Sequence, residues 1–406
     1  MKFRLVRAVG AALAAVALTA CGGSSDSTPS GSAPAGAASE IDKPVTLNLY
    51  PNTSPTTISR LAVFVTSVGS AAVNLPLVFD TGSAGVTLYA PAIFPASMVS
   101  ASGFVFPAGQ TSMTYNGITV TNQQGTREYG SNELHTQTGN LGFAQLTFGD
   151  AQGTLTTTTM PVFLYYSAQE VATGTPVAPQ EGNNGYFGVA STNGTITIAG
   201  SVEPAGGYPA CATDTVGTCQ VVSAFKYLQY VAGVNAGFML SPEPIQVCDV
   251  TAAGSCTPEP LLTVGLTPAL EAGFSTMSLL CGSAYFTGPA DIAGFPLCEK
   301  TIENTTFTAS GGGQVGSTTG GAVFDTGTDG MQIAPQPGSS FPGAVTPGSM
   351  VTIGTTSGFT YTYVSGTGPL ETSVIADTSD ISIVGIGFFT TQSYFLDFTS
   401  STVGWK

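Results

Sequence analysis

The residues best suited to chemistry are two aspartates that stand in the same short motif. Asp80 follows an apolar run and begins Asp-Thr-Gly-Ser, and Asp325 follows a similar run and begins Asp-Thr-Gly-Thr. Residues 78–88 and 323–333 align without gaps and share six identical positions. One such motif has a chance likelihood on the order of one in a hundred, and two in matching context are far less likely. The sequence therefore predicts a pair of carboxylates assembled from two halves of the chain.

Such a pair could hydrolyse an amide bond. Two carboxylates held about 3 Å apart in a poorly hydrated site cannot both ionise, because like charges repel strongly there. One keeps a proton, the other stays charged, and the pair titrates as a unit. The charged member can take a proton from a bridging water, while the protonated one polarises a carbonyl and later protonates the leaving amine.

The residues that follow the two aspartates could support the pair. Each glycine permits a tight turn whose backbone NH groups reach the carboxylate. The hydroxyl after each glycine could bond the outer carboxylate oxygen, and the threonine before it could interlock with its counterpart across the two halves. The six residues are Thr81, Gly82, Ser83, Thr326, Gly327 and Thr328.

The composition favours strands over helices. Of 406 residues, 42% are hydrophobic and only 8% are charged, and 52 are glycine. Helical surfaces normally need Lys, Glu and Arg, so this usage favours strands and turns. Short β-branched and aromatic runs between turn residues, such as 61–68, 195–198 and 359–364, agree with it. We expect an all-β protein of two domains, with one short helix at 268–272.

The N-terminus predicts export and a lipid anchor. Residues 1–20 carry three basic residues before an apolar segment too short to span a bilayer, as a signal peptide does. The segment ends in Leu-Thr-Ala before Cys21, which resembles the bacterial lipobox, where cleavage precedes an acylated cysteine. Residues 21–43 are rich in Gly, Ser, Ala and Pro and indicate a flexible linker. We expect a lipoprotein of the bacterial cell envelope, in the outer membrane if the cell is Gram-negative.

The expected partners are a peptide or protein substrate and the membrane that holds the lipid. The formal net charge of −15, with nine Lys plus Arg, argues against nucleic acid, whose affinity depends on basic contacts. No cofactor is expected, and we expect a monomer.

Six of the seven cysteines predict disulfides. An even set in an exported chain is typical of disulfide bonding, and pairing of sequence neighbours is the simplest of fifteen connectivities. The spacings are not Cys-x-x-Cys and the chain has one histidine, so no metal site is expected. The pairs would be Cys211–Cys219, Cys248–Cys256 and Cys281–Cys298.

Around both motifs the chain resembles a pepsin-like aspartic peptidase of the two-lobed kind. Residues 184–190 resemble the segment that lies beside the first Asp loop in that family, 383–385 its counterpart in the second lobe, and 387–405 the closing strands. The resemblance implies two β-barrel-like lobes with a cleft between them. Residues 44–215 would form the N-terminal lobe, with the first Asp loop and the flap. Residues 216–406 would form the C-terminal lobe, with a disulfide-bearing insertion and the second Asp loop.

The resemblance also implies a lid over the carboxylates. Residues 128–142 resemble the flap hairpin of the family, with Tyr129 as the flap tyrosine. The segment is about three residues longer than the usual flap, so Tyr115 is an alternative. Thr87 stands where the family usually carries a tryptophan, and residues 205–320 are poorly matched.

Two functions follow from these features. The first is an envelope-anchored aspartic endopeptidase that prefers hydrophobic residues and acidic pH, and the second is a catalytically silent lipoprotein of the same fold that binds a peptide or protein. A serine hydrolase is disfavoured, because the chain has no Gly-x-Ser-x-Gly elbow beside its histidine. His135 is expected in an exposed loop, Asp150 and Asp329 in turns, and Tyr165 and Trp405 in the core.

Overall fold

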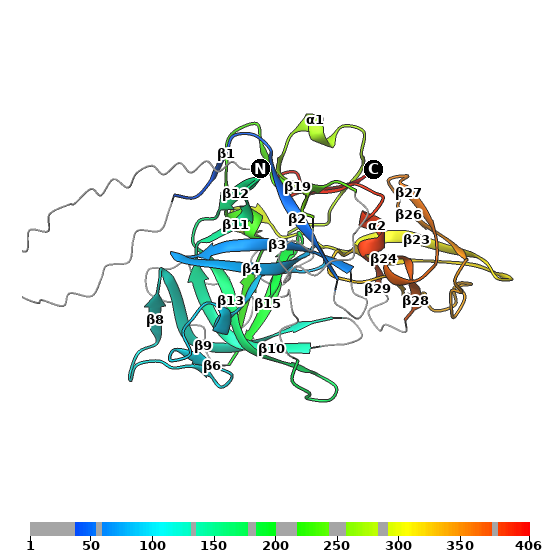
Figure 1. The fold of residues 1–406 in the computed structure, drawn as a ribbon. Coiled ribbons are helices and arrows are strands. Elements are labelled where there is room, and N and C mark those ends of the chain that lie inside the picture. Colours follow the sequence, from blue (N-terminus) through cyan, green and yellow to red (C-terminus); the bar gives the residue numbers. More distant parts are fainter. Residues whose placement is uncertain are drawn as a thin grey trace, which may run out of the picture. The chain divides into compact units, whose positions relative to one another are not determined.

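Almost all of the regular secondary structure in the computed structural model is β-strand (Figure 1). It describes residues 37–53, 59–130, 135–177, 184–199, 217–242, 257–282, 291–375 and 381–406, which belong to one compact unit, Ala33–Lys406. The predicted signal peptide lies outside the described residues, as do Cys21, Cys211, Cys248 and Cys256. No helix among the described residues is long and apolar enough to cross a bilayer.

Most strands of the first half of the chain, and the last strands of the second, belong to one closed, barrel-like sheet system. Its strands are β2 (Val45–Thr53), β3 (Ser59–Val68), β4 (Ala71–Asp80), β5 (Ala84–Tyr89), β8 (Ser112–Tyr115), β9 (Ile118–Tyr129), β10 (His135–Ala144), β11 (Leu146–Asp150), β12 (Gly153–Thr156), β13 (Met160–Glu170), β14 (Tyr186–Val189), β15 (Gly194–Ile198), β16 (Thr218–Val221), β18 (Asn235–Leu240), β19 (Glu259–Leu266), β20 (Ser275–Ser278), β30 (Tyr394–Asp397) and β31 (Thr402–Trp405).

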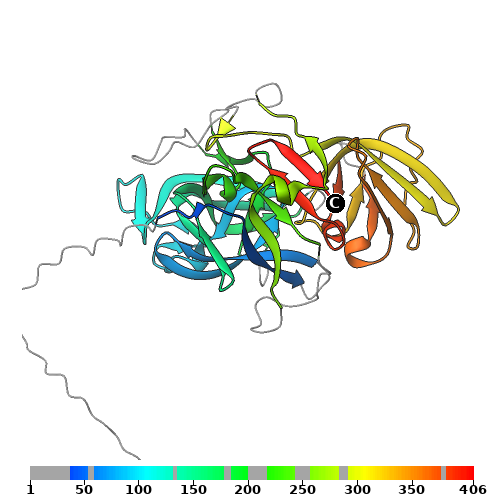
Figure 2. The same cartoon turned by 90° about the horizontal axis from the view of Figure 1, so that it is seen from above.

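A separate seven-stranded sheet carries the second motif, and it is drawn in yellow to orange in Figures 1 and 2. In spatial order its strands are β27 (Thr360–Val364), β26 (Met350–Gly354), β23 (Ile302–Gly311), β24 (Gln314–Phe324), β29 (Ile381–Val384), β25 (Met331–Ile333) and β28 (Thr372–Val374).

Short elements complete the described fold. Two-stranded sheets pair β1 (Glu40–Ile41) with β17 (Gln229–Tyr230), β6 (Val99–Ser100) with β7 (Gly103–Phe104), and β21 (Asp291–Ile292) with β22 (Phe295–Pro296). The helical turns are η1 (Ala90–Ala92), η2 (Ala224–Tyr227), α1 (Pro268–Glu271), η3 (Gly368–Leu370) and α2 (Ile386–Phe389), where η marks a 3₁₀ helix. The predicted short helix at 268–272 is therefore confirmed as α1.

The internal repeat of the sequence is a repeat of strand topology. In the first half, β14 runs parallel to β4 and antiparallel to β5, with Gly188 opposite Asp80. In the second half, β29 runs parallel to β24 and antiparallel to β25, with Val384 opposite Phe324. Each aspartate thus follows a strand that is held between its neighbours on both sides, and the segments predicted to lie beside the two Asp loops do so.

The continuous sheet connects the two halves of the chain. β2 pairs with β19, β19 with β18, and β18 with β30, so residues 45–49 share a sheet with residues 394–397. The aromatic residues Phe79 and Phe238, from the two halves, meet edge to face with ring centroids 5.7 Å apart. Each fully buried aromatic ring stabilises the fold by roughly 2–3 kcal/mol, so the base of the first Asp loop is firmly packed.

Several single-residue expectations are also settled. Trp405 is fully buried against Phe324, and Tyr165 is buried in β13, as predicted for the core. Asp150 ends β11 and accepts a hydrogen bond from the backbone NH of Gln152 at 2.9 Å, as a turn residue does. The expectation that His135 lies in an exposed loop is wrong.

Candidate active site

Asp80 is the last residue of β4 and is only 5% exposed. Its Oδ1 accepts hydrogen bonds from the backbone NH groups of Gly82, at 2.8 Å, and Ser83, at 3.2 Å. The Ser83 hydroxyl donates to Asp80 Oδ2. The tight turn after the strand therefore holds the carboxylate at both oxygens.

Asp325 is held in the same way in the second half. Gly327 donates its NH to Asp325 Oδ1 at 2.7 Å, and the Thr328 hydroxyl donates to Oδ2 at 2.6 Å. The backbone NH of Asp325 donates to Val384 O at 2.9 Å, which ties the loop to β29. The predicted supporting roles of the glycines and hydroxyls therefore match the geometry.

The two threonines interlock across the two halves. Thr81 N donates to Thr326 Oγ1 at 3.1 Å, and Thr326 N donates to Thr81 Oγ1 at 2.9 Å. Each hydroxyl then donates to a backbone carbonyl of the opposite strand, Thr81 to Phe324 O at 2.7 Å and Thr326 to Phe79 O at 2.6 Å. Four buried hydrogen bonds thus fix one loop on the other.

This interlock brings the two carboxylates together. A Cβ placed on Gly82 would lie 2.3 Å from Asp325 Cγ, and one on Gly327 would lie 2.7 Å from Asp80 Oδ1. Each carboxylate therefore packs over the glycine of the opposite loop, and the Asp325 carboxyl lies close enough to Asp80 to raise the pKa of that residue. Only glycine fits at either position.

Two negative charges on the buried carboxyl groups would repel each other strongly, and one proton shared between them removes this repulsion. Burial and the nearby Asp325 carboxylate raise the pKa of Asp80 to about 7, against the opposing effects of the Ser83 hydroxyl and the Lys300 ammonium. Because the two groups interact strongly, the proton belongs to the pair.

The hairpin of β9 and β10 carries Tyr129 beside the pair. Tyr129 is buried and stacks on Tyr186, with ring centroids 4.1 Å apart, and His135 stacks on Tyr129 at 5.8 Å. His135 is the first residue of β10, opposite Tyr129, and it lies half-buried beside the rings of Tyr129 and Tyr186. Thr87, at the position where tryptophan was expected, accepts a hydrogen bond from Tyr186 N at 3.1 Å. Tyr186 therefore provides the aromatic support for Tyr129.

The alternative tyrosine lies elsewhere in the fold. Tyr115 ends β8 and packs on Phe94, with ring centroids 5.3 Å apart. Tyr129 instead feels the charge of Asp80, which contributes to raising the pKa of Tyr129, although burial is the main cause. Of the two tyrosines, Tyr129 is therefore the one that lies near Asp80.

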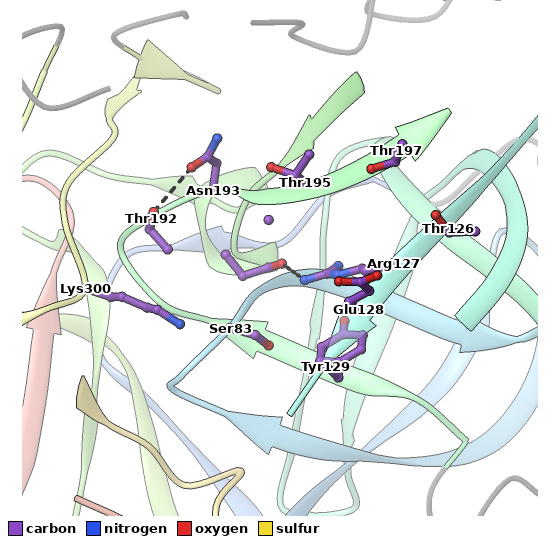
Figure 3. Close-up of a pocket in the computed structure, with 12 residues that line it drawn as sticks. Ser83, Thr126, Arg127, Glu128, Tyr129, Thr192, Asn193, Thr195, Thr197 and Lys300 are labelled. Carbon is purple, nitrogen blue, oxygen red and sulfur yellow. Dashed lines mark hydrogen bonds between the residues drawn. The ribbon is translucent and has the colours of Figure 1, made fainter. Parts of the chain in front are cut away.

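A pocket of about 460 Å³ opens beside the first Asp loop (Figure 3). Ser83, Tyr129 and two cations, Arg127 and Lys300, line it. Neither cation was predicted from the sequence. Because the chain has only nine Lys plus Arg, each one could have been considered as a candidate site residue. Nothing in the local sequence, however, indicates that Lys300 lies near residue 82.

One predicted disulfide is confirmed beside this pocket. Cys281 and Cys298 are bonded, with an S–S distance of 2.01 Å, two residues before Lys300. Cys219 also takes part in a disulfide, while its predicted partner Cys211 lies outside the described residues. The predicted pair Cys248–Cys256 lies outside them entirely.

Comparison with known proteins identifies the fold. No protein-family model matches the chain, and no curated protein matches it. Among solved structures it is similar to the crystal structure of an aspartic proteinase from Irpex lacteus, with a TM-score of 0.51 and 14% sequence identity. The match covers 89% of this chain and 97% of that chain. The fold is therefore the all-β, two-lobed, pepsin-like fold.

Proposed function

We propose that the protein is an aspartic endopeptidase that hydrolyses peptide bonds with Asp80 and Asp325. The observation that carries the proposal is the reciprocal packing of the two carboxylates, each over the glycine of the other loop. A similarity of fold at 14% sequence identity does not indicate an activity, so the proposal rests on the geometry of the pair. Buried, strongly interacting carboxylates are typical of functional sites.

The reaction would use one proton shared by the pair. The charged carboxylate takes a proton from a bound water, the oxygen of which attacks the carbonyl carbon, while the protonated carboxyl gives its proton to the carbonyl oxygen. The resulting tetrahedral intermediate breaks its C–N bond as the amine takes a proton from one carboxyl of the dyad, and a hydroxyl of the intermediate returns its proton to the other carboxylate, which restores the singly protonated pair. The donors of the two loops hold the outer carboxylate oxygens throughout, so the carboxylates need no reorientation.

The shared proton favours activity on the acid side of neutrality. The raised pKa of Asp80, about 7, means that the pair loses its proton as the pH rises through that value. A fully ionised pair has no acid to give the carbonyl, so activity should fall there. Tyr129 on the β9–β10 hairpin would cover the bound peptide, and the preference for hydrophobic residues at the scissile bond is carried over from the family resemblance.

The test is cleavage of a denatured protein mixture between about pH 3 and pH 7, with and without pepstatin, analysed by mass spectrometry. The variants Asp80→Asn and Asp325→Asn should each abolish cleavage, whereas Asp42→Asn, an exposed aspartate outside the site, should not. Absence of cleavage by the unchanged protein would overturn the proposal. Tight peptide binding in its place would support the alternative, a binding lipoprotein without turnover.

We also propose that the protein is anchored in the cell envelope through a lipid on Cys21. The support is the sequence pattern around Cys21, which lies outside the described residues. The variant Cys21→Ser should move the protein from the membrane to the soluble fraction and remove labelling by a radioactive fatty acid. Unchanged fractionation would refute the anchor.

A further inference from the structure

The pocket beside the first Asp loop is built from residues that also contact the carboxylate pair. Ser83 lines the pocket and donates its hydroxyl to Asp80, and Tyr129 lines it from the hairpin above. A ligand in this pocket would therefore lie next to the reacting bond. An extended peptide advances about 3.3–3.6 Å per residue, so such a ligand group belongs to a residue within a few positions of that bond.

Lys300 brings one positive charge to the pocket. Its ammonium donates a hydrogen bond to Gly82 O and lies close enough to Asp80 to act on the pKa of that carboxyl. The backbone around it is firmly held, because the Cys281–Cys298 disulfide precedes it and Ser191 Oγ donates to Glu299 O at 3.2 Å. Lys300 is thus fixed at the pocket wall.

Arg127 brings the second positive charge from the opposite wall. Its side chain is only 4% exposed, and its Nη2 donates to Ala84 O. Its Nη1 is buried and has no hydrogen-bond partner among the described residues. Buried polar groups are nearly always paired, and an arginine donor left over in a pocket is suited to an acceptor on a ligand.

Figure 3 shows Lys300 and Arg127 entering the pocket from opposite sides, with Ser83 below and between them. Glu128 also lines the pocket, but strand alternation places its exposed side chain on the face of β9 opposite to that of Arg127. The walls contributed by Thr126, Thr192, Asn193, Thr195 and Thr197 are polar and uncharged. This mostly polar lining suits an anionic group better than a hydrophobic side chain.

We propose that this pocket binds a carboxylate of the peptide substrate, held by Lys300 and Arg127. The inference rests on the proposed function, since it names the substrate feature that the same site selects. A carboxylate matches the planar fork of arginine and the point charge of lysine in charge-assisted hydrogen bonds. Its source is either an Asp or Glu side chain or the free C-terminus of a short peptide.

The experiment uses a peptide with a hydrophobic pair at its centre, glutamine at the three flanking positions on each side, and an amidated C-terminus. Each glutamine is replaced singly by glutamate, and kcat/KM is measured at about pH 5.5, where a free glutamate is ionised. We expect one position at which glutamate raises kcat/KM about tenfold over glutamine, the gain typical of a charge-assisted hydrogen bond. In Lys300→Met the ratio of kcat/KM for the glutamate peptide to that for the glutamine peptide should fall to unity, whatever the change in the rate on either peptide.

The controls separate charge from folding. Lys43→Met removes an exposed lysine outside the pocket and should leave the preference unchanged. Lys300→Arg restores the charge and should restore most of the preference. A second series ends in a free carboxylate and carries glutamine only. If a free C-terminus at one distance from the scissile bond raises kcat/KM as glutamate would, then the carboxylate that the pocket binds is the C-terminal one.

Equal cleavage of glutamate and glutamine peptides in both series overturns this inference and leaves the proposed peptidase intact. If no peptide is cleaved, then the proposed function has failed, and binding decides the inference instead. In Asp325→Asn, fluorescence anisotropy should show about tenfold tighter binding of the favoured glutamate peptide than of its glutamine match. This difference should disappear on adding Lys300→Met, and equal affinities would overturn the carboxylate site.

Discussion

The interlock of Thr81 and Thr326 gives the sharpest quantitative prediction. In Thr81→Val the side chain keeps its shape and loses its hydroxyl, which donates to Phe324 O at 2.7 Å and accepts from Thr326 N at 2.9 Å. Both backbone groups would remain buried without that partner. A buried polar group left unpaired costs about 1–3 kcal/mol, so the loss of both partners should lower the free energy of unfolding by about 2–6 kcal/mol.

The assay is urea unfolding at about pH 5, followed by intrinsic fluorescence, together with kcat/KM on a common peptide. Thr326→Val should cost a similar amount, because its hydroxyl makes the mirror-image pair of bonds. The matched control is Thr362→Val, an exposed strand position whose hydroxyl bonds to the hydroxyl of the half-buried Thr352 at the surface. Water replaces that bond, so we expect a change within about 0.5 kcal/mol.

The double variant tests whether the two hydroxyls act as one unit. If the first substitution separates the two loops, then the second hydroxyl no longer reaches its partners. The decrease in the free energy of unfolding of the double variant should therefore be smaller than the sum of the two single decreases. The value of kcat/KM should fall by more than the fraction of unfolded protein accounts for, because a displacement of about 1 Å at the carboxylates can lower the rate about a hundredfold. A loss of stability below about 1 kcal/mol in both single variants would refute the interpretation that the interlock fixes the pair.

Three further predictions concern other contacts. Gly82→Ala places a Cβ 2.3 Å from Asp325 Cγ, so kcat/KM should fall at least about a hundredfold while the protein still folds; near-normal activity would contradict the packing of the pair. Burial lowers the pKa of Lys226 to about 7, so below that pH both folded and unfolded chains are protonated and the full penalty for burying the charge applies. The penalty fades as the pH rises toward 10.5, the ordinary pKa of the lysine. The stability of Lys226→Met relative to the unchanged protein should therefore be greatest below pH 7 and fall by a few kcal/mol toward pH 10, and a pH-independent difference in urea unfolding would refute this. Removing the disulfide with Cys281→Ala and Cys298→Ala opens a loop with a sequence separation of 17, so unfolding free energy should drop by about 3 kcal/mol, and no change in the urea midpoint would count against it.

The sequence predicted those features whose cause is local. The turn after Asp80 depends on three consecutive residues, and each of them makes the contact expected from its chemistry. The repeat at Asp325 placed a second copy of the same turn, so the pairing of the two loops followed from symmetry. The disulfide Cys281–Cys298 was predicted because the nearest partner in the chain is also the simplest one.

Features that depend on contacts between distant segments were missed or wrong. His135 was expected in an exposed loop because that is the commoner place for a lone histidine, yet it stacks on Tyr186, a residue from β14. Thr87 suggested a poorly supported flap, but the same distant tyrosine fills the space beside Tyr129. No local sequence pattern indicates which aromatic ring of another strand will pack on a given residue. The surroundings of His135 and of Tyr129 could therefore be seen only in the folded structure.

The charges of the cleft are the clearest case of this limit, and they change the view of the site. The two motifs predict the carboxylate pair, and the family resemblance implies a preference for hydrophobic residues, but neither indicates charged side chains beside the pair. Lys300 reaches Gly82 O although 218 residues separate them in the chain, and Arg127 turns its buried guanidinium toward the next residues of the same loop. This chain has few cations, yet it buries one of them here and fixes another beside a disulfide, and on this basis we proposed that the charge of the substrate is selected. The motif of the carboxylate pair says nothing of specificity, because the residues that would select a substrate come from strands and loops that only the fold brings to it.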